Sequence, residues 1–311
     1  MKYTTQKINS AFFGSSRFSV LALDELERLG FKPALVITTP DKPQGRKLTL
    51  TPTPVKTWAL ERKIPVLDPA KLDDTFVSTL TQASRQADNT QPLIDVFVVA
   101  SYGKIIPKTV IDIPTHKTLN IHPSLLPKYR GASPLQSAIL DDAKDTGVSI
   151  MVIDELMDHG PIIAQEKVHI EEWPTYEDFE ALMAVKGAAL LASILEKWVA
   201  GKIAAIAQDH TAATHTKKIS KRDATINLSD DPYLNFRKIQ AYHEWPQAHF
   251  FIQRKGEMMR VKITDAAYSK PSESIPGMLT IRKVIPDGGK EMDYGDFKRG
   301  YVENGNGRLK I

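Results

Sequence analysis

The sequence predicts an α/β fold in which a Rossmann-like domain with a mostly parallel sheet precedes a small C-terminal β-barrel of the OB-like kind. Short apolar runs alternate with helical or turn-rich segments through the first two thirds of the chain, which is the pattern of a parallel sheet covered on both faces. After residue 223 the apolar runs are split by Gly and Pro, as in small barrels. The 311 residues, 42% of them apolar, are enough for two cores.

The first unit of the predicted sheet is a strand, a turn and a helix. Residues 8–13 form an apolar run typical of a buried strand. Gly14 and two serines then open a helix whose Leu and Phe residues recur at helical spacing up to Gly30. The turn lacks the G-x-G-x-x-G pattern that lets the backbone approach a dinucleotide pyrophosphate, so NAD binding is disfavoured.

The remaining elements follow from apolar runs and helical periodicity. Further strands of the parallel sheet are predicted at residues 34–37, 64–67, 93–100, 119–121 and 148–153. Helices are predicted at residues 176–199 and 232–241, and β-like runs at 249–253, 260–263 and 278–281. A polar, basic segment marks a boundary, so we expect domains at residues 1–207 and 224–311, joined by a linker at 208–223.

Composition excludes several classes of function. Because the chain has no cysteine, disulfides, thiolate metal sites and a cysteine nucleophile are excluded. No apolar run approaches the roughly 18 residues of a membrane span, and the first residues lack the hydrophobic core of a secretory signal, so we expect a cytoplasmic protein.

The net charge of +4 is unevenly distributed along the chain. Residues 1–200 hold 22 Lys and Arg against 24 Asp and Glu, whereas residues 201–311 hold 19 against 13. A basic C-terminal third suits a polyanionic partner, although modest excesses of this size also occur on ordinary soluble surfaces.

An amide and an imidazole stand two residues apart at the end of a predicted strand. Asn120 and His122 flank Ile121, and in an extended strand residues i and i+2 point to the same face. Ligands of open α/β sheets bind at the carboxyl ends of the strands. The alternative is that Asn120 caps a turn and that His122 is a structural histidine. The loop of residues 123–131, with its prolines and its glycine, favours a binding site.

Three acidic residues lie between the next strand and the following apolar run. Asp154, Glu155 and Asp158 fall within five positions of one loop, and a carboxylate there can orient an imidazole or a water and stabilise an imidazolium. An aspartate close to a glycine is also common in ordinary turns. Spacing alone places Asp158 only slightly ahead of Asp154 as a catalytic group.

These residues carry a resemblance to a known family. The stretch Leu119-Asn-Ile-His-Pro-Ser-Leu-Leu-Pro-Lys-Tyr-Arg-Gly-Ala-Ser-Pro134, with Met157-Asp-His-Gly160 downstream, resembles the signature of the folate-dependent formyltransferases. Three further segments resemble the branch that acts on methionyl-tRNA: Pro40-Asp-Lys-Pro-Gln-Gly-Arg-Lys47, Thr216-Lys-Lys-Ile-Ser-Lys-Arg-Asp-Ala-Thr-Ile-Asn227 and Ala241-Tyr-His-Glu-Trp-Pro246. The resemblance covers about residues 8–265.

The resemblance implies transfer of a formyl group from 10-formyltetrahydrofolate to the α-amine of the methionine on initiator methionyl-tRNA, by a monomer and without metal or nicotinamide. Because that amine is the nucleophile, the site needs preorganised donors for the oxygen that gains charge. Asn120 and His122 are the expected donors. Asp158 is expected to hold His122 in its useful ionisation state and to help move protons.

The resemblance also assigns residues to the two substrates. The folate is expected to lie against Val98, Ala100, Tyr102, Ser124, Leu125, Leu126, Pro127, Ile153, Asp154, Glu155 and Leu156. The tRNA is expected to lie against a basic loop and the basic linker, through Lys42, Arg46, Lys47, Lys217, Lys218, Lys221 and Arg222. Phosphate contacts of this kind weaken as salt rises. The alternative for residues 40–47 is a mobile basic surface loop.

The sequence leaves other functions open. A sugar-nucleotide N-formyltransferase or a formyltetrahydrofolate hydrolase would use the same three residues on a smaller acceptor, and the basic loop and linker argue against both. A binding module without turnover would not need Asn120, His122 and Asp158 intact. Ser124 as a hydrolase nucleophile lacks the G-x-S-x-G context.

Overall fold

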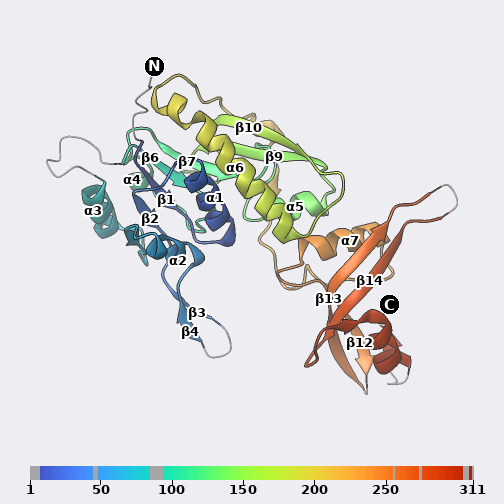
Figure 1. Ribbon diagram of the computed structural model, residues 1–311. Helices are drawn as coiled ribbons and strands as arrows, with labels where there is room; N and C mark the ends of the chain where they lie inside the picture. Colours follow the sequence, from blue (N-terminus) through green and yellow to red (C-terminus); the bar gives the residue numbers. More distant parts are fainter. Residues whose placement is uncertain are drawn as a thin grey trace. The chain divides into compact units, whose positions relative to one another are not determined.

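The computed structural model describes residues 8–44, 48–84, 94–254, 256–272, 275–303 and 308–309. The chain divides into two compact units that interleave along the sequence (Figure 1). Unit 1 holds the residues up to 132 together with 145–169 and 180–216, and unit 2 holds 133–144, 170–179 and the residues from 217 onward. Two short segments of the predicted first domain therefore pack with unit 2.

Unit 1 is built on a seven-stranded sheet with the order β10-β9-β7-β6-β1-β2-β5. The neighbours from β7 to β5 are parallel, whereas β9 and β10 pair antiparallel. The strands are β1 (Ser10–Phe13), β2 (Leu35–Ile37), β5 (Val66–Leu67), β6 (Val96–Val99), β7 (Thr118–His122), β9 (Asp145–Val152) and β10 (Ile162–His169). The predicted α/β class with a mostly parallel sheet is confirmed.

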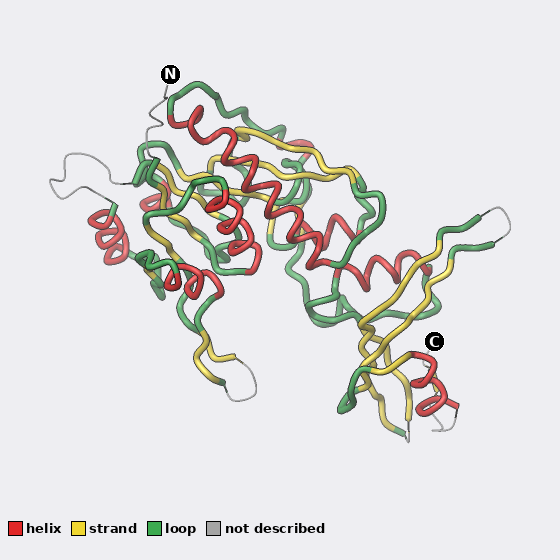
Figure 2. Tube along the Cα trace, in the orientation of Figure 1, coloured by secondary structure: helices red, strands yellow, loops and turns green. Residues whose placement is uncertain are grey.

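Helices cover both faces of this sheet, and along the chain they alternate with its strands (Figure 2). They are α1 (Arg17–Arg28), α2 (Pro54–Glu61), α3 (Asp74–Ala83), α4 (Lys108–Ile111) and α6 (Tyr176–Val199). On one face, Phe13 and Phe97 of the strands pack with Phe76 of α3 and Val110 of α4 in one buried cluster. The helix predicted at 176–199 has those bounds.

Local signals explain where α1 begins and ends. The Ser16 side chain accepts a hydrogen bond from the Ser19 backbone N–H, and the Ser19 side chain accepts one from the Ser16 backbone N–H, which is a capping box. A Cβ on Gly14 would lie 2.6 Å from that of Ser19, so only glycine lets the strand approach the helix so closely. After the helix, Gly30 adopts a φ of +90°, as predicted for its role as a stop.

The two faces of β7 are distinguished by their neighbours. Ile121 faces α6, because a Cβ on Gly187 of that helix would lie 2.3 Å from the Ile121 side chain. Thr118 faces the other way, since its hydroxyl donates to the carbonyl of Ile111 at the end of α4 over 2.8 Å. Asn120 and His122 alternate with Ile121 and therefore share the face of Thr118.

Unit 2 contains a five-stranded antiparallel sheet with the order β15-β14-β13-β12-β16. Its strands are β12 (His249–Arg254), β13 (Glu257–Ser269), β14 (Met278–Pro286), β15 (Met292–Asp293) and β16 (Arg308–Leu309). Its helices are α5 (Pro134–Leu140), α7 (Pro232–Ala241), α8 (Tyr294–Phe297) and the π-helical turn η2 (Lys298–Glu303). The helix predicted at 232–241 is confirmed, whereas the runs predicted at 260–263 and 278–281 are parts of longer strands. In the described residues the edge strands β15 and β16 do not pair with each other, so a closed barrel stays a prediction.

Three short features complete the fold. β3 (Lys42–Gln44) pairs antiparallel with β4 (Thr49–Thr51), and β8 (Arg130–Gly131) pairs in parallel with β11 (His215–Thr216). A single 3₁₀ turn, η1, spans His210–Ala212. No helix in the described part of the chain is long and apolar enough to cross a membrane. The same residues contain no group of three or more His, Asp or Glu arranged to hold a metal ion.

Candidate active site

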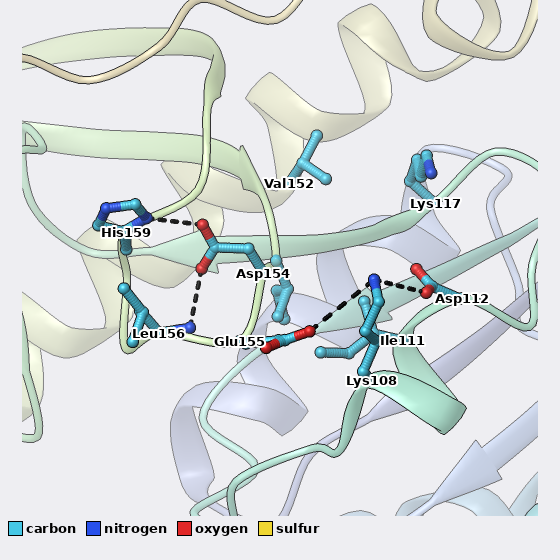
Figure 3. A pocket seen from close by; sticks show the side chains of 10 residues that line it. Lys108, Ile111, Asp112, Lys117, Val152, Asp154, Glu155, Leu156 and His159 are labelled. Carbon is cyan, nitrogen blue, oxygen red and sulfur yellow. Dashed lines mark hydrogen bonds and ion pairs between the residues drawn. The ribbon is translucent and has the colours of Figure 1, made fainter.

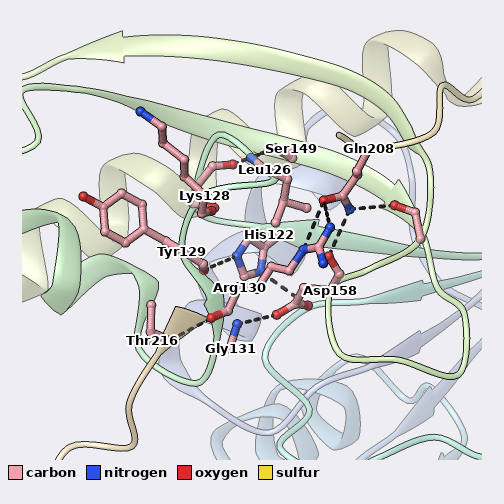
Figure 4. Close-up of polar contacts among 12 residues, drawn as sticks. His122, Leu126, Lys128, Tyr129, Arg130, Gly131, Ser149, Asp158, Gln208 and Thr216 are labelled. Atoms are coloured by element: carbon pink, nitrogen blue, oxygen red, sulfur yellow. Dashed lines mark hydrogen bonds and ion pairs between the residues drawn. The ribbon is translucent and has the colours of Figure 1, made fainter. Parts of the chain in front are cut away.

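The three predicted catalytic residues come from β7 and from the loop after β9. His122 is 4% exposed, and its Nδ1 lies 3.6 Å from Oδ1 of Asp158 (Figure 4). Asn120 is half-buried and stands two residues, roughly 7 Å, before His122 on the same face of β7. Among the described residues the Asn120 amide has no hydrogen-bond partner. The fold thus brings together the imidazole and the carboxylate beside a free amide.

The tautomer of His122 follows from its contact with Tyr129. Nε2 lies 3.0 Å from the Tyr129 carbonyl, and because a carbonyl only accepts, Nε2 must carry a proton. Tyr129 presents this carbonyl from the left-handed region, with a φ of +60°, and its own N–H donates to the Thr214 hydroxyl over 2.8 Å. Nδ1 is therefore the nitrogen that faces Asp158, and the pair attracts when Nδ1 is also protonated.

One carboxylate oxygen of Asp158 accepts a backbone hydrogen bond, and the other faces the imidazole of His122. Oδ2 accepts the N–H of Gly131 over 2.7 Å, while Oδ1 faces His122. Gly131 has a φ of +114°, and a Cβ there would lie 2.8 Å from the Thr216 hydroxyl, so the position requires glycine. Asp158 itself has a φ of +50°, which aspartate tolerates better than most residues.

Asp154, the other candidate catalytic aspartate in the sequence, forms hydrogen bonds with residues other than His122. Its Oδ2 lies 2.7 Å from Nδ1 of His159, and its Oδ1 accepts the N–H of Leu156 over 3.0 Å. Of the two aspartates, Asp158 is the one that contacts His122.

A buried polar network that was not predicted from the sequence connects Arg130 to the loop of Asp158. Oε1 of Gln208 accepts hydrogen bonds from Arg130 Nε over 3.2 Å and Nη2 over 2.6 Å, and its Nε2 donates to the carbonyls of Asp158 over 2.9 Å and Gly160 over 2.7 Å. Nη2 of Arg130 also lies 2.9 Å from Nδ1 of His210. Arg130 lies inside the signature stretch at residues 119–134, so its position in the sequence could have indicated a role near the site. Gln208 had no such signal, because it begins a polar segment interpreted as a surface linker.

The loop after His122 is held in place by several hydrogen bonds. The Ser149 hydroxyl donates to the carbonyl of Ser124 over 2.6 Å and accepts the N–H of Leu126 over 3.1 Å. The Ser124 hydroxyl donates to the carbonyl of Lys128 over 2.7 Å, in a residue that is only 1% exposed. Ser124 therefore shapes the loop with Leu125 and Pro127, and its hydroxyl is not presented as a nucleophile.

A hollow of about 400 Å³ opens beside the acidic loop (Figure 3). It is lined by Lys108, Ile111, Asp112, Lys117, Val152, Ile153, Asp154, Glu155, Leu156 and His159, four of which are predicted folate residues. Ile153 donates its N–H to the carbonyl of Thr118 over 2.8 Å, which puts the hollow at the start of β7. At its rim, a hydrogen bond to Asp112 raises the pKa of Lys108.

The other seven predicted folate residues lie outside the lining of this hollow: the four of the loop at residues 124–127, described above, and Val98, Ala100 and Tyr102. Val98 pairs with Leu119, so its side chain points to the face opposite Asn120. Ala100 is fully buried. Tyr102 is 2% exposed, packs edge-on against Phe13 at 5.5 Å, and has its pKa raised to about 12 by burial. Their role at the folate stays a prediction.

The predicted tRNA-binding residues that the structure describes are exposed. Lys42 lies on β3 in unit 1, and its charge adds to burial in lowering the pKa of Lys104. Arg46 and Lys47 lie outside the described residues. The remaining four belong to unit 2 and are Lys217, Lys218, Lys221 and Arg222.

Comparison with known proteins places this site in a family. The model of the formyl transferase family matches residues 7–195. The methionyl-tRNA formyltransferase of Chloroflexus aggregans is 40% identical over 86% of this chain and 83% of its own, and that of Thermus thermophilus is 34% identical over 94% and 95%. The crystal structure of the N-formyltransferase from Helicobacter canadensis, in complex with folinic acid and dTDP-3-aminofucose, has a similar fold, with a TM-score of 0.60 and 19% identity over 86% of this chain and 90% of that one. The resemblance found in the sequence is confirmed: the chain belongs to the formyl transferases, in the methionyl-tRNA formyltransferase family.

Proposed function

We propose that this enzyme transfers a formyl group from 10-formyltetrahydrofolate to the α-amine of the methionine on initiator methionyl-tRNA. The observation that carries the proposal is the approach of Asp158 to His122 beside the free amide of Asn120, in a chain of this family. The methionine amine attacks the formyl carbon, a new C–N bond forms, and the bond from that carbon to N10 of the folate breaks. No covalent enzyme intermediate is needed.

The site suits the charges that this reaction creates. Negative charge develops on the formyl oxygen during attack, and donors that are already in place stabilise it. Asn120 offers its unpartnered amide, and His122 offers Nδ1 once that nitrogen is protonated. Asp158, whose Oδ1 faces His122 and accepts no hydrogen bond within the described residues, takes the proton that the amine loses. The imidazolium of His122 then returns a proton to N10 as the folate leaves.

The hollow beside the acidic loop fits the formyl donor. Its volume of about 400 Å³ suits one flat bicyclic ring, and its lining combines apolar Ile111 and Ile153 with the carboxylate of Asp154. Because the hollow is lined by Lys117, which precedes β7, a molecule that extends from it along the face of β7 that carries Asn120 reaches Asn120 first and His122 next. The Helicobacter canadensis structure is a complex with folinic acid, which supports a folate as the ligand class.

A direct assay tests this function against its alternatives. The protein is incubated with 10-formyltetrahydrofolate in the presence and absence of initiator methionyl-tRNA, and formyl-methionine, free formate and tetrahydrofolate are measured. We expect formyl-methionine and an equal amount of tetrahydrofolate only when the tRNA is present. Formate release without tRNA would identify a hydrolase, and formylation of a dTDP-amino sugar in preference to tRNA would identify a sugar N-formyltransferase.

The basic linker is expected to contribute to tRNA affinity and not to folate affinity. Replacing Lys217, Lys218, Lys221 and Arg222 with Ala together removes up to four phosphate contacts. Each lost contact lowers the slope of log affinity against log salt by about 0.7 to 0.9. We therefore expect the KM for tRNA to rise at least about tenfold at low salt with a shallower salt dependence, and the KM for the folate to stay within about twofold.

A matched control removes four exposed lysines of unit 1: Lys32, Lys63, Lys167 and Lys202. This variant has the same net charge as the linker variant. An equal rise in the KM for tRNA in both variants would show that total charge matters and the linker does not. The cytoplasmic location and the monomeric state stay predictions.

A further inference from the structure

Gln208 connects the Asp158 loop to Arg130 through four hydrogen bonds (Figure 4). The residue is 6% exposed; its hydrogen bonds to Arg130 and to the Gly160 carbonyl are buried, and the one to the Asp158 carbonyl is partly buried. The amide oxygen accepts twice and the amide nitrogen donates twice, which is the full capacity of a glutamine in this arrangement. One buried side chain therefore fixes the main chain at both Asp158 and Gly160.

Arg130 strengthens this connection. Arg130 is 4% exposed, and among the described residues its guanidinium contacts the amide of Gln208 and Nδ1 of His210. A hydrogen bond from a charged donor polarises the amide that accepts it. The two N–H groups of Gln208 consequently donate more strongly to the carbonyls of Asp158 and Gly160.

Asp158 needs such support because of its conformation. Its φ of +50° lies in the left-handed region, which aspartate tolerates better than most residues but adopts less readily than glycine, so contacts that hold the main chain there stabilise it. Within the described residues, the side chain accepts one hydrogen bond, from the N–H of Gly131 to Oδ2. The hydrogen bond from Gln208 to the Asp158 carbonyl is a second anchor, on the main chain.

We propose that Gln208, polarised by Arg130, is a positioning residue that keeps the Asp158 carboxylate directed at His122. It touches neither substrate and acts through Asp158. The proposal rests on the function proposed above, because it assigns Gln208 a part in proton transfer between His122 and Asp158. Nothing in this role requires that the glutamine contribute to binding of the folate or the tRNA.

Two substitutions test the hydrogen-bond acceptor and the hydrogen-bond donors of the Gln208 amide separately. Gln208→Met removes both the acceptor and the donors at similar size. Gln208→Glu keeps an acceptor for Arg130, in a favourable ion pair, and removes the two N–H donors to Asp158 and Gly160. Because a displacement of about 1 Å at a reacting group can lower a rate roughly 100-fold, we expect kcat for formyl transfer to fall roughly 10- to 100-fold in both variants. The KM for the folate and for tRNA should change less than about threefold. Gln208→Glu also provides a folded variant if Gln208→Met is unstable.

Two readouts distinguish positioning from a general structural role. The pH dependence of kcat in Gln208→Met should move in the same direction as in Asp158→Asn, because both changes take a carboxylate away from His122. The double variant Asp158→Asn/Gln208→Met should be within about threefold of Asp158→Asn, because residues that act through one another are not additive. Multiplicative losses, or an unchanged pH profile in an impaired single variant, would overturn the proposal.

A control and a reference complete the experiment. Gln240→Met removes a glutamine of α7 whose amide donates to a main-chain carbonyl, that of Trp173 over 3.3 Å, and should leave kcat within about twofold. The unmutated protein is the reference for the function itself. An inactive reference would refute the proposed reaction, whereas an active reference together with fully active Gln208→Met and Gln208→Glu variants would refute the role of Gln208 alone.

Discussion

Replacing His122 with Ala is expected to lower kcat for formyl transfer by roughly 100- to 1,000-fold, the usual cost of losing one preorganised donor to a developing oxyanion. The substitution removes Nδ1, which faces Asp158, and Nε2, which holds the carbonyl of Tyr129. His122→Gln is the companion variant, because it keeps a donor near that carbonyl and loses the titrating group. Single-turnover formylation of initiator methionyl-tRNA at saturating folate is the measurement.

Thermal unfolding measurements and a control substitution at another histidine distinguish loss of catalysis from loss of folding. His122 is buried, so its removal also leaves a cavity, and activity is compared at a temperature where each variant is folded. His169 is an exposed histidine that also faces an aspartate, with Nδ1 2.8 Å from Asp145, and His169→Ala should be unchanged. If His122→Ala and His122→Gln formylate within a few-fold of the unmutated protein, the assignment of the site must be abandoned.

Gly160→Ala is expected to damage both stability and turnover. A Cβ at Gly160 would lie 2.0 Å from the carbonyl oxygen of Val152, a backbone atom that cannot rotate away. The loop between these residues must therefore shift, and it carries Asp158. Overpacking of this kind costs about 1–3 kcal/mol or more in the free energy of unfolding. A shift of about 1 Å at Asp158 would lower the rate roughly 100-fold.

Gly300→Ala is the matched control for this substitution. A Cβ at Gly300 meets no atom within 4 Å, and its φ is outside the left-handed region, so alanine is tolerated there. Urea unfolding and formylation rates are measured for both variants. Gly160→Ala with unchanged stability and rate would show that the Asp158 loop adapts freely, which would also weaken the positioning role proposed for Gln208.

The parts of the fold that rest on local patterns were predictable. The helices at residues 176–199 and 232–241 have the predicted bounds, and α1 ends before Gly30, because apolar periodicity and end signals act over a few neighbouring residues. The strand carrying Asn120 and His122 was predicted for the same reason. The long β13 and β14 were predicted too short, because hydrogen bonds between strands carry them through residues whose own pattern is weak.

Contacts between distant residues were not predictable. Gln208 is 50 positions from Asp158 and 78 from Arg130, and its polar surroundings in the sequence indicated a linker on the surface. It is buried because β11 pairs with β8 and draws that segment against the loop after His122. No local pattern encodes such a pairing.

By itself, the sequence determined the α/β class and the family and predicted Asn120, His122 and Asp158 as the catalytic groups, because these depend on residue types, short spacings and a family resemblance. Only the tertiary structure shows how the two aspartates of this loop differ physically: the N–H of Gly131 holds Asp158 beside the imidazole of His122, whereas Asp154 contacts His159 and Leu156. It also decided which nitrogen of His122 faces that carboxylate, because the Tyr129 carbonyl accepts from the other. These choices depend on groups that meet only after the chain has folded, so they follow from positions in space and not from order along the chain.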